Sequence, residues 1–290
     1  MKLCRFDDDR LGVVLGDDVV DVSAGVERLP VLRWPLPSGD PLFRHLDVLR
    51  PELDRLSRSG ARTPISQVQL KSPVATPSKL MAAPVNYRAH QAEAIADKTI
   101  SFGVDIKTIE HYGMFLKSAS GLVGPSEGVS LPATDRRMDH EVELAVVIGK
   151  SGFEIPRAQA RDYIAGYSIG LDMTIRGTED RSWRKSFDSF AVLGPWFVTA
   201  DEIPDPNALD FWLKVNGEVR QSSNTSALIY DVDRLIEYAS GAYALHPGDV
   251  IMTGTPEGVG PVVPGDVIDC YVERIGHMSV PVRLRPPAVR

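Results

Sequence analysis

The chain has few of the features that mark secreted or membrane proteins. Only two of its 290 residues are cysteines, Cys4 and Cys270, and they stand far apart and outside any CxxC pair. Neither a disulfide framework nor a thiolate metal site is therefore predicted. No apolar run reaches the roughly 20 residues that cross a bilayer, and the N-terminus lacks a secretory h-region. We expect a cytoplasmic protein with no membrane contact.

Positive charge is also in short supply. The chain has 32 Lys and Arg residues against 39 Asp and Glu, which gives a formal net charge of -7. The one basic cluster of note, RSWRK (181–185), is too short to follow a phosphate backbone, so no nucleic-acid partner is predicted. A composition of 43% hydrophobic and 24% charged residues is typical of a globular protein with a large core.

Residues 1–72 are predicted to form a small N-terminal domain of mixed α and β structure. Apolar pairs separated by acidic turns over residues 5–22 indicate two or three strands. A helix is expected within residues 43–60, in FRHLDVLRPELDRLSRSG. The proline-containing segment QLKSPVATPSKL (69–80) is typical of an extended linker, so we place the domain boundary near residue 72.

Residues 73–290 are predicted to form a second domain that is rich in β-sheet. Asn216-Gly217 between two alternating runs is the strongest short-range signal for a hairpin. Helices are expected between Pro156 and Gly166 and over residues 231–245, where the second has one apolar face. The fold class is α+β, with sheet dominating the larger domain.

Two carboxylates precede an uninterrupted apolar run in HEVELAVVIG (140–149). On a strand, Glu141 and Glu143 would project to one face, and two like charges close together need a cation between them. A second apolar segment, GYSIGLDMTIR (166–176), delivers Asp172 as it ends. Three carboxylates without Cys or His form an oxygen-only ligand set that suits Mg²⁺ or Mn²⁺ and leaves coordination positions open.

Other interpretations of the three acids remain open at this point. Glu141 and Glu143 could lie on a solvated strand edge, with Asp172 capping a turn. The three could also hold a structural Ca²⁺ in a non-catalytic, β-rich binding module, or pair with Lys185 and Arg176 without any metal.

Seven segments resemble, in the same order, motifs of the fumarylacetoacetate hydrolase family. The likeness covers roughly residues 73–290, and seven motifs in register are specific for the family although not for one reaction. The segments are NYRAHQAE (86–93), FLK (115–117), HEVELAVVIG (140–149), GYSIGLDMTIR (166–176), KSFDSFAVLGPW (185–196), LKVNGEVRQ (213–221) and TGTPEGVGP (253–261). The resemblance implies a β-rich catalytic domain of mixed sheets, or β-roll, behind the small N-terminal domain, and a homodimer.

The resemblance assigns the metal to Glu141, Glu143 and Asp172. It also assigns catalysis to His90 and Glu93, three apart on one face of a short lid helix, where the carboxylate would orient an imidazole that takes a proton from water. From the residues alone, a surface histidine in a helical ion pair is the alternative.

Further family roles fall on five residues. Lys185 matches a lysine beside the metal that steadies a developing enolate, and Arg176 matches an arginine that grips a substrate carboxylate. Thr255, Tyr87 and Lys117 match substrate-binding positions. Without the family context, Lys185 and Arg176 would be read as solvated charges, and the turn around Thr255 as a chain reversal.

The sequence departs from the family pattern in two places. Ala83-Pro84 stands where many members have a glycine-containing loop, and proline removes a backbone donor. Glu179 stands where a glutamine is common, and its charge would oppose an anionic substrate unless it turns away or pairs with Arg181 or Arg184.

The resemblance implies a small-molecule substrate with a 2-oxo or 1,3-dicarbonyl acid group. The hypothesis is a metal-dependent hydrolase that cleaves a C–C bond in an acylpyruvate-like acid and releases pyruvate and a second carboxylic acid. The alternative with the same site is an isomerase or decarboxylase of 2-hydroxy-dienedioates or oxaloacetate-like acids, as in aromatic catabolism.

Overall fold

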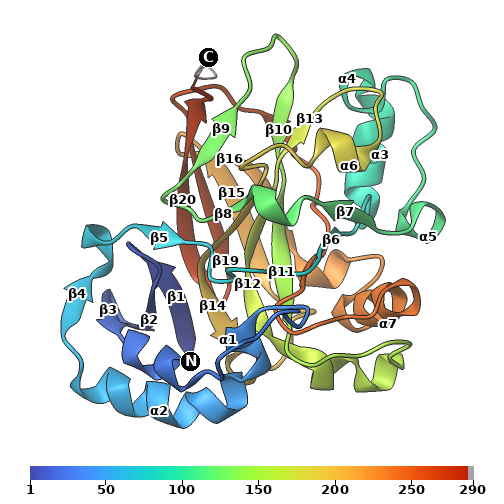
Figure 1. The fold of residues 1–290 in the computed structure, drawn as a ribbon. Helices are drawn as coiled ribbons and strands as arrows, with labels where there is room; N and C mark the ends of the chain where they lie inside the picture. Colours follow the sequence, from blue (N-terminus) through green and yellow to red (C-terminus); the bar gives the residue numbers. More distant parts are fainter. Residues whose placement is uncertain (287–290) are drawn as a thin grey trace.

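The structure is a computed structural model that describes residues 1–286 (Figure 1). Within those residues, a twelve-stranded sheet runs through the molecule. Its main path runs through β4 (Arg62–Pro64), β3 (Asp18–Asp21), β2 (Arg10–Leu15), β1 (Lys2–Phe6), β14 (Ala191–Thr199), β12 (Ile164–Asp172), β11 (Val142–Ile148), β17 (Val250–Met252), β6 (Leu80–Ala82) and β7 (Phe115–Lys117). Off this path, β5 (Leu70–Lys71) pairs with β1 and β8 (Leu122–Val123) pairs with β14.

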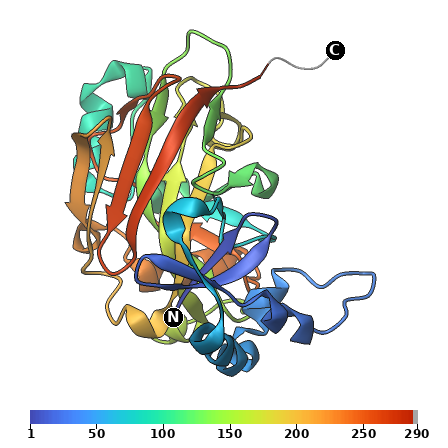
Figure 2. The ribbon, with the colours of Figure 1, turned by 90° about the vertical axis from the view of Figure 1, so that its left-hand side faces the viewer.

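Two smaller sheets complete the β structure of the described residues. The five-stranded sheet, drawn in orange to red in Figure 2 with a green edge strand, stands beside the large sheet. Its order is β16 (Glu218–Asn224), β15 (Asp210–Val215), β19 (Val267–Val272), β20 (Gly276–Leu284) and β9 (Val129–Leu131). The three-stranded sheet consists of β13 (Thr174–Ile175), β10 (Met138–His140) and β18 (Gly260–Pro261).

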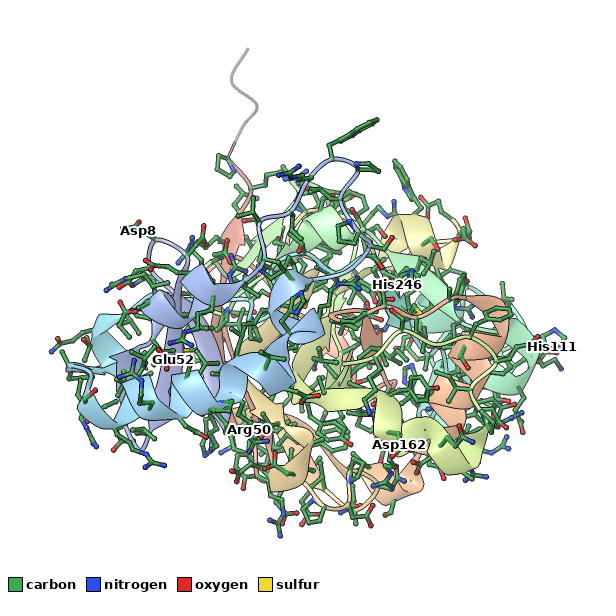
Figure 3. The ribbon with its side chains drawn as sticks, turned by 60° about the horizontal axis from the view of Figure 1, so that its bottom comes forward. Asp8, Arg50, Glu52, His111, Asp162 and His246 are labelled. Atoms are coloured by element: carbon green, nitrogen blue, oxygen red, sulfur yellow. The ribbon has the colours of Figure 1, made fainter. Side chains whose placement is uncertain are left out.

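The helices gather in two groups on either side of the sheets (Figure 1). Helices α1 (Pro41–Arg44) and α2 (Leu46–Ser59) pack beside the N-terminal strands, and α7 (Val232–Ala242) covers the main core. The second group also contains α3 (Arg88–Ala96), α4 (Lys98–Ser101), α5 (Ile109–Tyr112) and α6 (Arg181–Arg184), on the right in Figure 1. The 3-10 helices are η1 (Ser23–Arg28), η2 (Ile65–Gln67), η3 (Ala119–Gly121), η4 (Arg157–Tyr163), η5 (Ala200–Glu202) and η6 (Thr225–Ala227). In Figure 3, Glu52 of α2 and His111 of α5 lie at opposite ends of the molecule.

Strand β11 is buried on both faces, and its alternation explains the position of the acids. Leu144 and Val146 point into the main core, where they join Phe211 of the five-stranded sheet. Ala145 and Val147 point to the other side, into the core beneath the N-terminal strands. Because side chains alternate along a strand, Glu143 lies on the same side as Ala145 and Val147, away from the main core.

Most of the expected elements are confirmed. Strands β2 and β3 lie within the segment 5–22, and β1 ends inside it at Phe6. Helix α2 lies within 43–60, and α7 lies within 231–245. The hairpin at Asn216-Gly217 joins β15 to β16, with positive φ angles of 51° and 84° at the two turn residues. The α+β fold class is confirmed as well.

One expected helix is wrong in kind and length. Between Pro156 and Gly166 the chain forms the 3-10 helix η4, and β12 already begins at Ile164. Ala160 is buried in the main core while the next turn supplies Ile164 to the sheet, so sheet pairing decides the conformation there.

The boundary near residue 72 stays a prediction. Strand β1 pairs antiparallel with β14, so the large sheet is continuous across the two predicted domains. Val74, in the segment expected to be an extended linker, is completely buried.

Across residues 1–286, no helix combines the length and the apolar character that a bilayer crossing requires.

Candidate metal centre and active site

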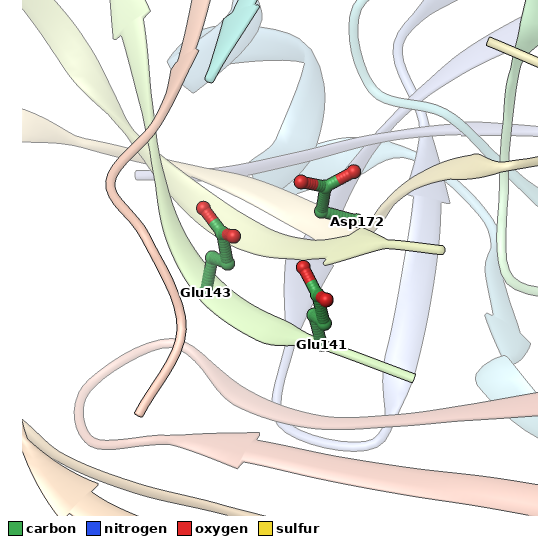
Figure 4. Close-up of side chains that lie close together, drawn as sticks. All are labelled: Glu141, Glu143 and Asp172. Atoms are coloured by element: carbon green, nitrogen blue, oxygen red, sulfur yellow. The ribbon is translucent and has the colours of Figure 1, made fainter. Parts of the chain in front are cut away.

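Three buried carboxylates meet where β11 and β12 run side by side. Glu141 lies in the break between β10 and β11, Glu143 is the second residue of β11, and Asp172 is the last residue of β12. The backbone N–H of Asp172 donates to the carbonyl of Glu141 at 2.9 Å, which fixes the register between them. One ligand oxygen from each side chain lies within 4.8 Å of the others, and Figure 4 shows all three on one side of the two strands.

Two lysines compensate part of this negative charge. Lys185 Nζ lies 2.5 Å from Glu141 Oε2 and 2.7 Å from Asp172 Oδ2. Lys117 Nζ lies 2.5 Å from Asp172 Oδ1, and its side chain is completely buried. Burial of a charged group is costly unless the group is paired, so these lysines and acids hold one another in place.

Arg176 completes the ion-pair network from the other side. Its Nε donates to Asp139 Oδ2 at 2.8 Å and its Nη2 donates to Glu141 Oε1 at 2.8 Å. Two of its donors are therefore engaged inside the protein, and the bidentate substrate clamp implied by the family resemblance stays a prediction.

The two glutamates ionise differently because only one of them has direct cationic partners. Burial opposes ionisation of Glu141, but Lys185 and Arg176 outweigh it and hold its pKa well below the ordinary value. Burial raises the pKa of Glu143 well above the ordinary value, and the charge of Asp172 raises it further. The backbone N–H of Gly254 donates to Glu143 Oε2 at 2.5 Å.

This donor set fits a hard divalent cation. All three ligands are carboxylate oxygens, as Mg²⁺ and Mn²⁺ prefer, and three protein ligands leave positions open to substrate. A cation among them would also relieve the repulsion that disfavours ionisation of Glu143.

His90 and Glu93 form a hydrogen-bonded pair, as the family resemblance implies. Both lie on α3, and His90 Nδ1 lies 2.9 Å from Glu93 Oε2. The other carboxylate oxygen of Glu93 accepts from the backbone N–H of Gly258 at 2.8 Å. Glu93 is thereby fixed between the lid helix and the turn TGTPEGVGP, and it fixes the imidazole ring in turn.

One cavity brings most of the expected site residues together. Its lining includes the three acids, His90, Arg176, Lys185 and Thr255. The hydroxyl of Thr255 donates to the carbonyl of Val142 at 2.9 Å and accepts from Gln221 Nε2 at 2.7 Å. Thr255 therefore joins the turn to β11 and to the five-stranded sheet.

Tyr87 and Lys117 lie behind the cavity wall. Tyr87 is 2% exposed and packs edge to face with Phe211. Neither residue is among those that line the cavity in the described part of the chain. Substrate contact stays a prediction for both, and the structure gives Lys117 a direct role in holding Asp172.

Sequence reasoning missed several residues of this site. Asp139 and Gln221 lie within or beside the recognised motifs, but their partners in the site are distant in sequence: Arg176 lies 37 residues from Asp139, and Thr255 lies 34 residues from Gln221. Arg181 and Arg184 also line the cavity. The sequence signal for these two is the basic cluster RSWRK, which by itself does not indicate a substrate site.

Of the two alternatives for Glu179, turning away from the substrate or pairing with Arg181 or Arg184, the structure agrees with the first. The Glu179 carboxylate forms two hydrogen bonds with Arg136, at 2.9 Å and 2.8 Å, instead of pairing with Arg181 or Arg184. Glu179 turns away from the cavity, so its charge does not face a substrate. The other departure, Ala83-Pro84, lines the cavity, and proline offers no backbone N–H there.

Comparison with known proteins agrees with this geometry. The family described as fumarylacetoacetate (FAA) hydrolase C-terminal matches residues 79–283, which include every expected site residue. The chain belongs to the fumarylacetoacetate hydrolase family. Its membership confirms the expectation drawn from the seven motifs.

Similar members of the fumarylacetoacetate hydrolase family include hydrolases and a tautomerase. Maleylpyruvate hydrolase of Aquipseudomonas alcaligenes is 54% identical over 285 residues, covering 98% of this chain and 99% of that protein. The crystal structure of maleylpyruvate hydrolase from Sphingobium sp. SYK-6 in complex with manganese (II) ion and pyruvate has a TM-score of 0.84 at 41% identity, covering 99% of this chain and 100% of that one. The mitochondrial oxaloacetate tautomerase fahd2 of Xenopus laevis is 34% identical over 303 residues, covering 97% of this chain and 90% of that protein.

Proposed function

We propose that the protein is a Mg²⁺- or Mn²⁺-dependent hydrolase that cleaves a C–C bond in an acylpyruvate, with maleylpyruvate as the first candidate substrate. The observation that carries this proposal is the convergence of Glu141, Glu143, Asp172 and His90 on one cavity. The similarity to two maleylpyruvate hydrolases, one of them solved with manganese and pyruvate, supports it.

The three carboxylates would hold the ion at the base of the cavity. When bound, the ion supplies Lewis-acid polarisation of the 2-oxo group and stabilises negative charge as it develops there. Lys185 lies within hydrogen-bonding distance of two of the three acids and adds positive charge beside the same point.

His90 is placed to act as the general base. Because Glu93 accepts from Nδ1, the other ring nitrogen, Nε2, is left without a proton and can take one from water. The water oxygen bonds to the distal carbonyl carbon, the adjacent C–C bond breaks, and its electron pair forms the enolate of pyruvate. The imidazolium then returns the proton to carbon, which yields pyruvate and a second carboxylic acid.

Two variants test the hydrolase. Glu141→Ala should abolish metal-dependent cleavage of maleylpyruvate, and circular dichroism is needed as a control because Arg176 and Lys185 lose a partner. His90→Asn should lower kcat by about 100-fold or more. Full activity of the folded Glu141→Ala variant after exhaustive chelation would contradict the proposal.

A second candidate function is tautomerisation of oxaloacetate, as the similarity to fahd2 suggests. That reaction needs charge stabilisation at the 2-oxo group but no attack by water. It should therefore be less sensitive to His90→Asn than hydrolysis is, and assaying both reactions on the same variant separates the two functions. A homodimer and a cytoplasmic location remain predictions beside it, open to analytical ultracentrifugation and to cell fractionation.

A further inference from the structure

Two arginines of the short helix α6 face the cavity without an acidic partner. Arg181 and Arg184 both line it, and residues three apart lie on the same face of a helix. Among residues 1–286, no carboxylate forms an ion pair with either of them. Asp180 is occupied as the N-cap of the helix, where it accepts from the backbone N–H of Ser182 at 2.8 Å.

The other cations of the site are all neutralised within the protein. Arg176, Lys117 and Lys185 each pair with at least one buried acid. Glu179, which precedes Asp180 in the sequence, gives its carboxylate to Arg136. Of the arginines and lysines that line the cavity, Arg181 and Arg184 are therefore the two without an acidic partner among residues 1–286.

The contacts of the two arginines hold their guanidinium groups in place without neutralising them. Arg184 Nε donates to the backbone carbonyl of Glu179 at 2.8 Å. The guanidinium of Arg181 lies 3.8 Å from the ring centre of Tyr112, the last residue of α5. Burial and the charges of Arg176 and Arg181 lower the pKa of Arg184, and the charges of Glu141 and Glu179 oppose them only in part, so an incoming anion would stabilise the charged guanidinium.

Apolar side chains line the same cavity. Ala94 of α3, Ile100 of α4, Ile106 of the loop after α4 and Phe115 of β7 are among them. A ligand that fills the cavity therefore meets the three acids, apolar side chains and the two arginines of α6. This combination suits an acid that carries a second anionic group besides the one near the acids.

We propose that Arg184, assisted by Arg181, binds a second carboxylate at the distal end of the substrate, so that the enzyme selects dianionic acylpyruvates over those with a neutral end. The inference rests on the proposed hydrolase function and names the residues that read its substrate. A planar guanidinium suits this task because it can bind a carboxylate through two parallel hydrogen bonds. Nη1 and Nη2 of Arg184 are the donors left over after its bond to Glu179.

The test compares maleylpyruvate, which carries a distal carboxylate, with acetylpyruvate, which ends in a methyl group. With Mn²⁺ present, Arg184→Met should reduce the preference for maleylpyruvate, measured as the ratio of the two kcat/KM values, by about 10- to 100-fold, mainly through KM. Arg184→Lys should restore part of the preference, because it keeps the charge and loses the fork. Arg62→Met, which removes an exposed arginine in β4, is the matched control and should leave the ratio at the wild-type value.

A binding measurement separates this inference from the hydrolase function. Calorimetric titration of the Mn²⁺-loaded protein with maleate and with isocrotonate, its analogue with a methyl group in place of one carboxylate, should show that Arg184→Met weakens maleate about tenfold more than isocrotonate. Equal losses for both ligands, or an unchanged substrate preference, would overturn the role of Arg184. If the wild type cleaves neither acylpyruvate, the hydrolase function fails and the maleate titration alone decides the role of Arg184.

Discussion

The carboxyl group of Glu143 should make divalent-ion binding depend on pH. Burial, with the charge of Asp172, raises its pKa well above the ordinary value of 4.5. Metal ligation needs the carboxylate form, so the ion displaces a proton that the folded, ion-free protein holds. Below the raised pKa, each pH unit upward should therefore tighten Mn²⁺ binding by up to about tenfold.

The same shift gives the ion-free protein a pH-dependent stability of opposite sign. The folded pKa of Glu143 exceeds the unfolded one, so its contribution is complete below about pH 4.5 and is lost as the pH rises through the folded pKa. Each unit of upward shift then costs about 1.4 kcal/mol of unfolding free energy above that pKa. Mn²⁺ at 100 times its Kd should restore about 2.7 kcal/mol.

The assay has two parts. Urea unfolding of ion-free protein between about pH 5 and pH 9 should show wild-type stability falling relative to Glu143→Gln, whose neutral amide mimics the protonated acid. Calorimetry in two buffers of different ionisation enthalpy should show protons released as Mn²⁺ binds. Glu27→Gln, at an exposed glutamate of η1, is the control and should behave like wild type. Mn²⁺ binding that releases no proton and has a pH-independent Kd would refute this reasoning.

Four further substitutions test the packing of the fold and the orientation of His90. Gly258→Ala would bring a methyl group to 2.0 Å from the carbonyl oxygen of Arg220 at a φ of +92°, so it should lower the unfolding free energy by about 1–3 kcal/mol and lower kcat by displacing the hydrogen bond to Glu93. Gly241→Ala is the matched control in α7, where open space surrounds the glycine, and it should raise the unfolding free energy by about 0.5–1 kcal/mol. Urea unfolding measures both. Glu93→Gln should lower kcat by about 10- to 100-fold with little change in KM, measured by steady-state kinetics, since it weakens the orientation of the imidazole and leaves the ion site intact; a loss confined to KM would contradict it. Leu144→Ala, at a side chain that is 1% exposed in β11, should destabilise the fold by about 2–5 kcal/mol in the same unfolding assay, and a loss below about 1 kcal/mol would show that the core there is loose.

Local signals predicted local structure well. The hairpin at Asn216-Gly217 follows from the positive φ angles that these two residue types tolerate. The apolar face of α7 is a periodicity that the sequence itself displays, and the uninterrupted apolar run of β11 indicates a buried strand. The failure between Pro156 and Gly166 came where the pairing of β12 with β11 overrides the helical pattern of the preceding turn.

The features of the candidate site likewise divide into those that follow from local sequence and those that depend on tertiary structure. The sequence alone placed Glu141 and Glu143 on one side of a strand, and the family motifs supplied the list of residues to expect beside them. The tertiary structure decided which charged groups form ion pairs. Arg136 pairs with Glu179, 43 residues away in the chain, and Lys117 pairs with Asp172, 55 residues away. Within residues 1–286, this leaves Arg181 and Arg184 at the cavity without an acidic partner.

By itself, then, the sequence determined the fold class, the strand beside two of the acids, and the placement of His90 and Glu93 on one face of a helix, because these features depend on patterns of residues a few positions apart. Only the tertiary structure decided where each long charged side chain finds its partner. Such pairings depend on sheet register and on the path of loops between distant segments, and a change of one residue in register would turn the same side chains to the opposite face.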